Sequence, residues 1–129
     1  MLRPAGEDLA ARRPVWEALA EMFLDTDPAL SRQWRAERLA GSPYSLDQLE
    51  HILVDEVNPV CRYNLMPVAG EWAGFNSEWL EARILHRLHS PLRFLHRLAM
   101  RRLAPDLREE WRATRDAIVA SRGAGPEGT

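Results

Sequence analysis

The chain has 129 residues, a formal net charge of −2, 46% hydrophobic residues and 28% charged residues. A chain of this length is expected to form one domain that buries about two thirds of the surface of its unfolded state. The composition is that of a globular protein and excludes a wholly disordered chain. The slightly negative net charge argues against a general binder of nucleic acid or of anionic membranes, although it is compatible with a local basic patch.

Cysteine content and hydropathy predict a cytoplasmic protein. Cys61 is the only cysteine, so no intramolecular disulfide can form and a reducing compartment is expected. The residues after Met1 include several charged side chains and lack the apolar stretch of a signal peptide. No uninterrupted apolar run approaches about 18 residues, so we expect no transmembrane helix.

The first two helices are predicted from apolar spacing and proline positions. Residues through about Gly6 are expected to be frayed, and Pro14 suits the first turn of the first helix. Asp27 followed by Pro28 is typical of an N-cap and a first helical position, and it opens the second helix, which is expected to end at Gly41. The expected buried residues of these helices are Val15, Trp16, Leu19, Met22, Phe23, Leu30, Trp34 and Leu39.

A third helix is predicted from about Leu46 to Val57. Ser45 and Gln48 have the spacing of a capping box, which marks its beginning. Pro59 is expected to end or kink this helix, or Asn58 and Pro59 begin one short extra turn. The expected inner face is Leu46, Leu49, Ile52 or Leu53, and Val57.

The segment Asn58 to Phe75 interrupts the helices but has the apolar content of a core. A connection of this length without secondary structure is uncommon in a compact domain and is usually functional or a misread element. Gly70 and Gly74 flank Trp72, and either glycine could adopt a positive φ. Two interpretations stay open: Trp72 and Phe75 fold inward to plug the helices, or the exposed part of the turn carries a ligand or partner site.

Three further helices are predicted after this segment. Asn76 or Ser77 caps the fourth, Pro91 follows Ser90 at the start of the fifth, and Pro105 opens the sixth. Their expected inward residues are Trp79, Leu80, Ile84, Leu88, Leu92, Leu95, Leu98 or Ala99, Leu103, Leu107, Trp111 and Ile118.

These elements predict an all-α fold: a compact single-domain bundle of about five to six helices, with one long packed loop between the third and fourth. The domain is expected to span residues 1–122. Residues 123–129 form a polar, Gly-rich tail that cannot bury enough surface to become ordered, so we expect it to be disordered.

Charge is distributed unevenly along the chain, and all basic residues are arginine. Residues 1–60 contain six Arg and eleven acidic residues, whereas residues 61–129 contain eleven Arg and eight acidic residues. Two rows of like charge at helical spacing are Glu17, Glu21 and Asp25 in the first helix and Arg93, Arg97 and Arg101 in the fifth. Three interpretations remain: solvated faces, internal pairing of the two rows, or recognition of a partner.

No motif assembles a catalytic or metal site. His86, His89 and His96 could offer imidazoles to a metal ion, but nearby arginines would oppose a cation and no acid or cysteine lies in this segment. Cys61 could be a nucleophile with His51 as its base and Glu71 to orient that base, yet a lone cysteine in an apolar context is more typical of a small buried residue. We therefore assign no catalytic residue, no metal and no cofactor.

The chain resembles a family of small, uncharacterised bacterial proteins that share a domain of unknown function. The strings that carry the resemblance include RRPVWEAL at residues 12–19, SPYSL at residues 42–46 and GEWAGF at residues 70–75. The resemblance covers about residues 12–84. It implies no activity, cofactor or catalytic residue.

We expect a non-enzymatic module that binds and masks another protein, and a toxin-neutralising immunity protein is the most concrete form of this hypothesis. The acidic first half of the chain would meet a basic protein partner and steer its association. The expected contact residues are Glu17, Glu21, Asp25, Asp47, Glu50 and Asp55.

Two alternative functions stay open, and neither involves a membrane. A small-molecule-binding protein or an enzyme would use the loop at residues 58–75 and would contain a titratable group of shifted pKa. The residues expected to line its pocket are Cys61, Tyr63, Glu71 and Trp72. A nucleic-acid-binding regulator would use the Arg-rich face of residues 83–102, with binding that weakens steeply as salt rises. The choice between monomer and homodimer is also open.

Overall fold

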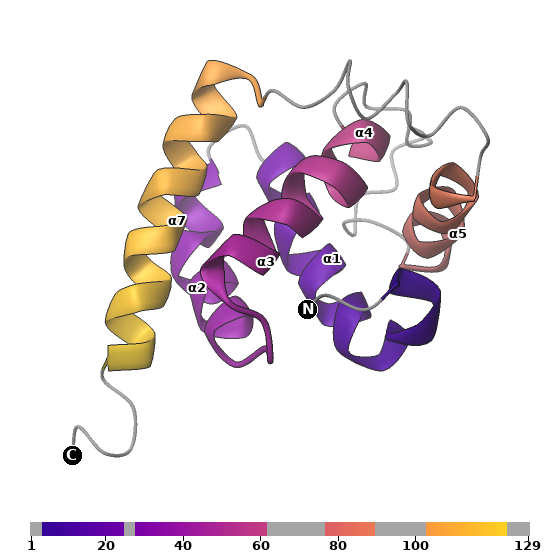
Figure 1. Ribbon diagram of the computed structural model, residues 1–129. Coiled ribbons are helices and arrows are strands. Elements are labelled where there is room, and N and C mark those ends of the chain that lie inside the picture. The colour runs from indigo at the N-terminus through magenta and orange to yellow at the C-terminus, as the bar shows by residue number, and fades with distance from the viewer. Residues whose placement is uncertain (1–3, 25–27, 62–76, 90–102, 124–129) are drawn as a thin grey trace.

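The computed structural model describes residues 4–24, 28–61, 77–89 and 103–123 (Figure 1). Every regular element in these ranges is a helix, so the predicted all-α fold is confirmed. Within the same ranges, no helix has both the length and the apolar character needed to cross a membrane.

The helices form three parts that lie side by side. α1 and the run of α3, η3 and α4 occupy the centre, α2 and α7 lie on one side, and α5 lies on the other (Figure 1). α7 packs mainly along α2, and α2 in turn packs on α1. The described elements, in chain order, are η1 (Ala5–Glu7), α1 (Leu9–Leu24), η2 (Pro28–Ser31), α2 (Arg32–Ala40), α3 (Leu46–Ile52), the π-helix η3 (Leu53–Val57), α4 (Asn58–Cys61), α5 (Ser77–Leu88) and α7 (Pro105–Gly123).

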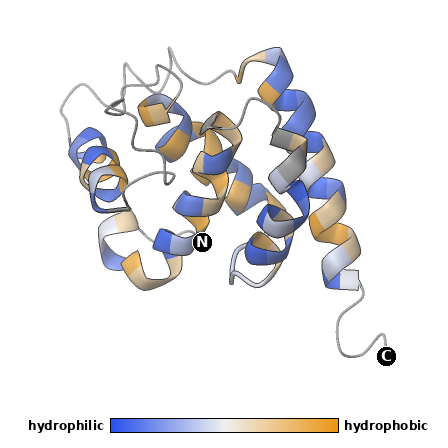
Figure 2. Ribbon diagram, turned by 180° about the vertical axis from the view of Figure 1, so that it is seen from behind, coloured by the Kyte–Doolittle hydropathy of each residue, from blue (hydrophilic) through white to orange (hydrophobic). Residues whose placement is uncertain are grey.

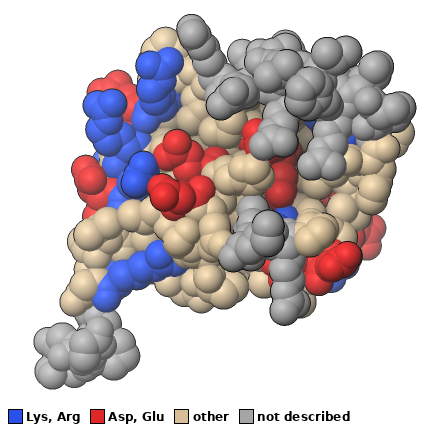
Figure 3. All heavy atoms as spheres, viewed as in Figure 1, with Lys and Arg blue, Asp and Glu red and all other residues tan. Residues whose placement is uncertain are grey.

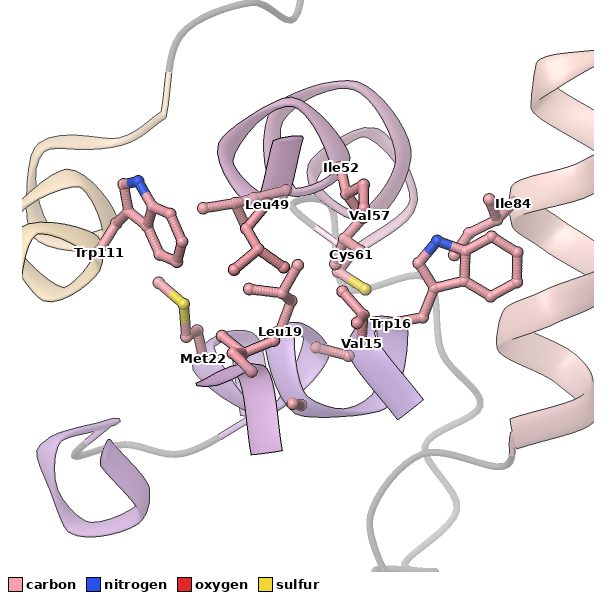
Figure 4. Packing of buried hydrophobic residues seen from close by; sticks show 14 of the residues in the cluster. Val15, Trp16, Leu19, Met22, Leu49, Ile52, Val57, Cys61, Ile84 and Trp111 are labelled. Atoms are coloured by element: carbon pink, nitrogen blue, oxygen red, sulfur yellow. The ribbon is translucent and has the colours of Figure 1, made fainter. Parts of the chain in front are cut away.

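The core lies where α1 meets these neighbours. The helices carry hydrophilic as well as hydrophobic residues, as expected for amphipathic helices that bury one side (Figure 2). Figure 4 shows Leu19 and Met22 of α1 facing Leu49 of α3 and Trp111 of α7. The other half of the core joins α1 to η3, α4 and α5 through Val15, Trp16, Val57, Cys61 and Ile84 (Figure 4).

α3, η3 and α4 follow one another without a break, which corrects the boundary predicted near Val57. The capping box is confirmed: the Ser45 hydroxyl accepts from the Gln48 amide, and the Gln48 side chain accepts from the Ser45 amide. The π turn then joins the Asn58 amide to the Leu53 carbonyl. A proline ring clashes with the carbonyl four residues earlier in a regular α-helix, and here the wider π turn lies directly before Asn58 and Pro59.

The segment predicted as a long loop from Asn58 therefore begins later. Residues 58–61 are helical and all four are buried, so the expectation of a loop there is wrong for this part. The alternative of one extra turn at Asn58 and Pro59 is confirmed. Residues 62–76 lie outside the described residues. The two interpretations of the central loop, including the inward position of Trp72, therefore stay predictions.

The first helix begins earlier than predicted. α1 starts at Leu9, because the Asp8 carbonyl accepts from the Arg12 amide at 2.9 Å, so Pro14 lies inside the helix and not in its first turn. The residues before it form the 3₁₀ turn η1, and its Ala5 side chain is buried. The expectation that residues through Gly6 are frayed is wrong for residues 4–6.

The inner face of α2 also differs from the prediction. A helix does open at Pro28 and end at Gly41, as predicted, although its first turn is the 3₁₀ helix η2. Leu39 is buried, but Trp34 is 41% exposed, so its predicted burial is wrong. Arg35 and Ala36 are buried in its place. The buried side of α2 was predicted from the spacing of its apolar residues alone. Because the charged Arg35 lies on the buried side, that spacing placed Trp34 there wrongly.

In the second half, the described helix starts agree with prediction, and of the predicted inward residues Trp79, Leu88 and Leu107 are half-buried. α5 begins at Ser77 with Leu80 and Ile84 buried, and α7 begins at Pro105 with Trp111 and Ile118 buried. The predicted fifth helix lies outside the described residues except for its last expected inward residue, Leu103, which is buried. The predicted tail lies outside the described residues from position 124 onward.

Candidate functional site

The first buried polar cluster joins α1 to the π-helix η3. The Arg12 guanidinium donates from Nη1 to both carboxylate oxygens of Glu56, at 3.1 and 3.2 Å. The indole Nε1 of Trp16 donates to the same carboxylate at 2.8 Å. Arg12 is fully buried and Glu56 is almost so, so this pair interacts in a low-dielectric environment where a lost partner would be costly.

Two more residues extend this cluster toward the surface. The Tyr44 hydroxyl donates to Asp8, and the Asp8 carboxylate lies 3.9 Å from Arg12 Nε. The Arg12 guanidinium also lies over the Tyr44 ring, 5.6 Å from its centre. Burial, together with the hydrogen bond to Asp8, raises the pKa of Tyr44 to about 12. Because each of these polar groups bonds another member of the cluster, its clearest role is to hold the start of α1, the Tyr44 segment and η3 together.

The second buried polar cluster joins α2 to α7. The Arg32 guanidinium donates to both oxygens of Glu110, each at 2.7 Å, and Arg35 Nη1 donates to the same carboxylate at 3.3 Å. Arg35 also reaches Thr114 of α7 and Ser31. The hydrogen bond from Arg32 lowers the pKa of Glu110, against the opposing effect of its burial. Glu110 is therefore a carboxylate shared by two guanidinium groups.

Two further contacts hold α7 in place. Glu50 of α3 accepts from Trp111 Nε1 and from Arg115 Nη1, each at 3.0 Å. Near the end of α7, the Arg122 guanidinium donates to four backbone carbonyls at the end of α2 and in the segment that follows it. These carbonyls belong to Leu39, Ala40, Ser42 and Tyr44. Arginine is suited to this position because cations are stabilising beside the carbonyl end of a helix.

The acidic residues expected to contact a partner differ in how available they are. Asp47 is exposed in the first turn of α3, and the Glu50 side chain remains 45% exposed beside Arg115. Asp55 is largely covered and lies 3.1 Å from His51 Nδ1. Glu17 and Glu21 are half-buried and already make interactions within the molecule, and Asp25 lies outside the described residues. Asp47 and the Glu50 side chain are thus more exposed to solvent than Glu17 and Glu21 of α1.

Figure 3 shows where charge gathers on the face seen in Figure 1. Acidic side chains lie near the middle of this face, beside a group of basic side chains over α7. α3 crosses the middle of the same view in Figure 1. The two signs of charge are thus adjacent on this face, and Asp47 and Glu50 are the acidic pair of α3 that solvent can reach.

Of the four residues expected to line a pocket in the central segment, the structure describes only Cys61. Cys61 is buried against the apolar core, and burial raises the pKa of its thiol to about 12. A thiol in this state is a poor nucleophile at neutral pH, since the thiolate is the reactive form. Tyr63, Glu71 and Trp72 lie outside the described residues, so the pocket they were expected to line stays a prediction.

The histidine and arginine candidates lie partly on α5. Arg83, His86 and His89 are exposed, and the Arg83 guanidinium lies over the Trp79 ring at 5.9 Å. His96 and the arginines from 93 to 102 fall outside the described residues. Within the described ranges, no three His, Cys, Asp or Glu side chains come together in a way that could hold a metal ion.

Sequence reasoning missed the buried charged residues Arg12, Arg35, Glu56 and Glu110. A usable signal did exist for the first cluster. Arg12 precedes Val15, Trp16 and Leu19 at helical spacing, so it shares the side of α1 that faces the core. The sequence could not predict that Glu56 pairs with Arg12, because the two residues are 44 positions apart.

Comparison with known proteins gives a family match. A family model described as Domain of unknown function (DUF7079) matches residues 10–117. This range extends the predicted resemblance from residue 84 into α7, and it includes both buried polar clusters except for Asp8. No curated protein and no solved structure matches the chain.

Proposed function

Because the chain belongs to the DUF7079 family, a domain of unknown function, we propose its function from its own surface: it is a non-enzymatic module that binds and masks another protein. A toxin-neutralising immunity protein is the most concrete form of this proposal. The partner is a basic protein, and the contact surface is the acidic edge of α3, defined here by Asp47 and Glu50.

The observation that carries the proposal is the way α3 presents these two carboxylates. Its opposite side is fixed in the core by Leu49 and Ile52, which are fully buried, and its first turn is fixed by the capping box at Ser45. Asp47 therefore faces solvent from a rigid element, and the Glu50 side chain on the same element stays 45% exposed while it accepts from Trp111 and Arg115. Carboxylates in such positions steer a basic partner and add salt-dependent affinity, and they lose little conformational entropy when it binds.

The structure changes which substitution tests this proposal best. Charge reversal at Glu21 would disturb an internal interaction as well as a surface, because Glu21 is half-buried and already engaged. Asp47→Arg changes an exposed residue. Glu78→Arg is a matched control, since Glu78 is also an exposed acid in the first turn of a helix, so both reversals lose the same favourable interaction with the helix dipole.

The experiment is recovery of the tagged protein from lysate of its native host at low and high salt, followed by identification of what co-purifies. A single basic protein that dissociates as salt rises would support the proposal, and its affinity should fall about tenfold or more with Asp47→Arg. It should change little with Glu78→Arg. Retention of no protein at either salt, or equal effects of the two reversals, would count against it.

A further inference from the structure

α7 is attached to the helices beside it through polar groups at three places along its length. Near its start it is bound to arginines of α2, then to Glu50 of α3, and near its end to backbone carbonyls at the end of α2 and just after it. The attachments are spread over the helix, so we expect α7 to stay or to leave as a unit. The side chains of α7 that make them are Glu110, Trp111, Arg115 and Arg122.

The apolar contribution of α7 to the core is small for a helix of 19 residues. Of its buried residues, Trp111 and Ile118 are hydrophobic, whereas Glu110 and Thr114 are polar. Burial of apolar surface is the main stabilising contribution to packing, so α7 should be held less firmly than α1. The buried hydrophobic residues of α1 include Val15, Trp16, Ala18, Leu19, Ala20 and Met22.

The ion pair buried between α2 and α7 adds little to the net free energy of closing this interface. Arg35 is fully buried and Glu110 almost so, and both charges return to water when α7 leaves α2. The cost of taking two charges out of water offsets much of their attraction. Separation of the two helices therefore costs less than removal of one charge while the other stays buried.

The packing of the other described helices does not pass through α7. α2 packs on α1, and α1 packs on η3, α4 and α5, whereas α7 packs mainly along α2 (Figure 1). A part of a protein with few links to the rest opens at a lower free energy than the core. The arrangement thus favours a state in which α7 is open and the other helices remain packed.

We propose that α7 is a latch, which opens as a unit from α2 and α3 while the helices from α1 to α5 stay folded. Opening removes Trp111 from Leu19, Met22 and Leu49, the core residues that it faces (Figure 4). It also takes from Glu50 both of the donors that α7 supplies, so the acidic edge of α3 becomes more negative. The latch goes beyond the proposed function, because its opening needs no partner.

The test is native-state hydrogen exchange of the purified full chain, followed by NMR at increasing concentrations of urea below the unfolding transition. After correction for intrinsic rates, the amides of α7 should exchange as a group, about tenfold or more faster than the slowest amides of α1. Their exchange should depend less on urea, because opening of one helix exposes less surface than global unfolding. Amides of α7 that exchange only together with those of α1, with the same urea dependence, would overturn the proposal.

A core variant separates opening of the latch from global unfolding. Ile84 of α5 is fully buried in the half of the core that α1 shares with η3, α4 and α5, and it stays packed when α7 opens (Figure 4). Ile84→Val should therefore accelerate the slowest amides of α1 about two- to tenfold and leave the exchange of α7 unchanged at low urea. Equal acceleration of α1 and α7 would show that α7 opens only through global unfolding.

A variant of the latch should act differently. Arg122→Ala removes an attachment that both the open and the unfolded state lack, so it should accelerate α7 and the slowest amides of α1 by the same factor, about tenfold. Arg112→Ala is the matched control, because Arg112 is an exposed arginine of the same helix, and it should change neither rate. If Arg112→Ala accelerates α7 as much as Arg122→Ala does, the proposed attachment is wrong.

Discussion

Two helix interfaces in this protein are each built around a buried arginine, and they differ in how charge is balanced. Between α1 and η3, Arg12 donates hydrogen bonds to Glu56, which also accepts from Trp16, and the Asp8 carboxylate lies 3.9 Å from Arg12 Nε. Between α2 and α7, the carboxylate of Glu110 is shared by Arg35 and the half-exposed Arg32. The first interface lies within the core, whereas the second attaches the C-terminal helix at its edge.

This difference indicates different sensitivities to loss of the carboxylate. When Glu56 is lost, the Arg12 guanidinium stays fully buried, with the Asp8 carboxylate 3.9 Å from its Nε. When Glu110 is lost, Arg32 can turn outward because its side chain is already 37% exposed, and the buried Arg35 keeps its contacts with Thr114 and Ser31. Removal of one partner is most costly where the remaining charge stays buried.

The largest effect is therefore expected for Glu56→Ala. It leaves the buried guanidinium of Arg12 and the indole N–H of Trp16 without their shared acceptor, and should lower the free energy of unfolding by about 3–5 kcal/mol. Urea denaturation followed by far-UV circular dichroism measures this loss. A loss below about 1 kcal/mol would mean that water or a neighbouring group satisfies Arg12 after the substitution.

Glu110→Gln should have an intermediate effect. The amide keeps one acceptor oxygen for Arg32 but removes the negative charge that two guanidinium groups share, so we expect a loss of about 1–3 kcal/mol. The measurement is the same denaturation series. If this variant loses more stability than Glu56→Ala, the proposed ranking of the two interfaces is wrong.

The α2–α7 interface also predicts a pH dependence. Arg32 lowers the pKa of Glu110 in the folded state, so the folded carboxyl binds its proton less readily than the unfolded one. The contribution to stability is therefore present above the unfolded pKa of about 4.3, and it is lost as pH falls through the folded pKa. The slope of unfolding free energy against pH in this acidic range should be smaller for Glu110→Gln. Parallel curves for wild type and variant would contradict this assignment.

The smallest effect is expected for the exposed ion pair of Arg13 on α1 and Glu81 on α5. Its hydrogen bonds lower the pKa of Glu81, but the Arg13 side chain is 52% exposed, so solvent screens the interaction. Arg13→Ala should leave the midpoint of urea unfolding almost unchanged. A loss comparable to that of Glu110→Gln would show that this pair fixes α5 more firmly than its exposure suggests.

Local signals predicted the helix boundaries that depend on local chemistry. The capping box at Ser45, the stop at Gly41 and the start at Pro105 each involve residues within one helical turn, so a single sequence contains them. The start of α1 was placed too late because Pro14 matches the signal for a first turn but lies inside the helix.

Features that depend on tertiary partners were not predicted. Arg12 and Arg35 are buried only because carboxylates 44 and 75 residues away meet them. Trp34 was assigned to the core by its type, whereas the arginine beside it took the inward position. Of the candidate contact residues, the sequence could not separate the exposed Asp47 from the engaged Glu21, since both are acids at helical positions.

The π-helix η3 has a consequence for tolerance to length changes. A π turn contains one residue more than the α-turn it replaces, so the chain could be shortened by one residue within Leu53–Val57 while remaining helical. An extra residue in an uninterrupted α-helix would rotate everything after it by about 100°. The π turn instead takes up the extra residue by widening, since the Asn58 amide bonds the Leu53 carbonyl five residues earlier. A deletion that restores an α turn should therefore leave Cys61 facing the core in nearly the same orientation.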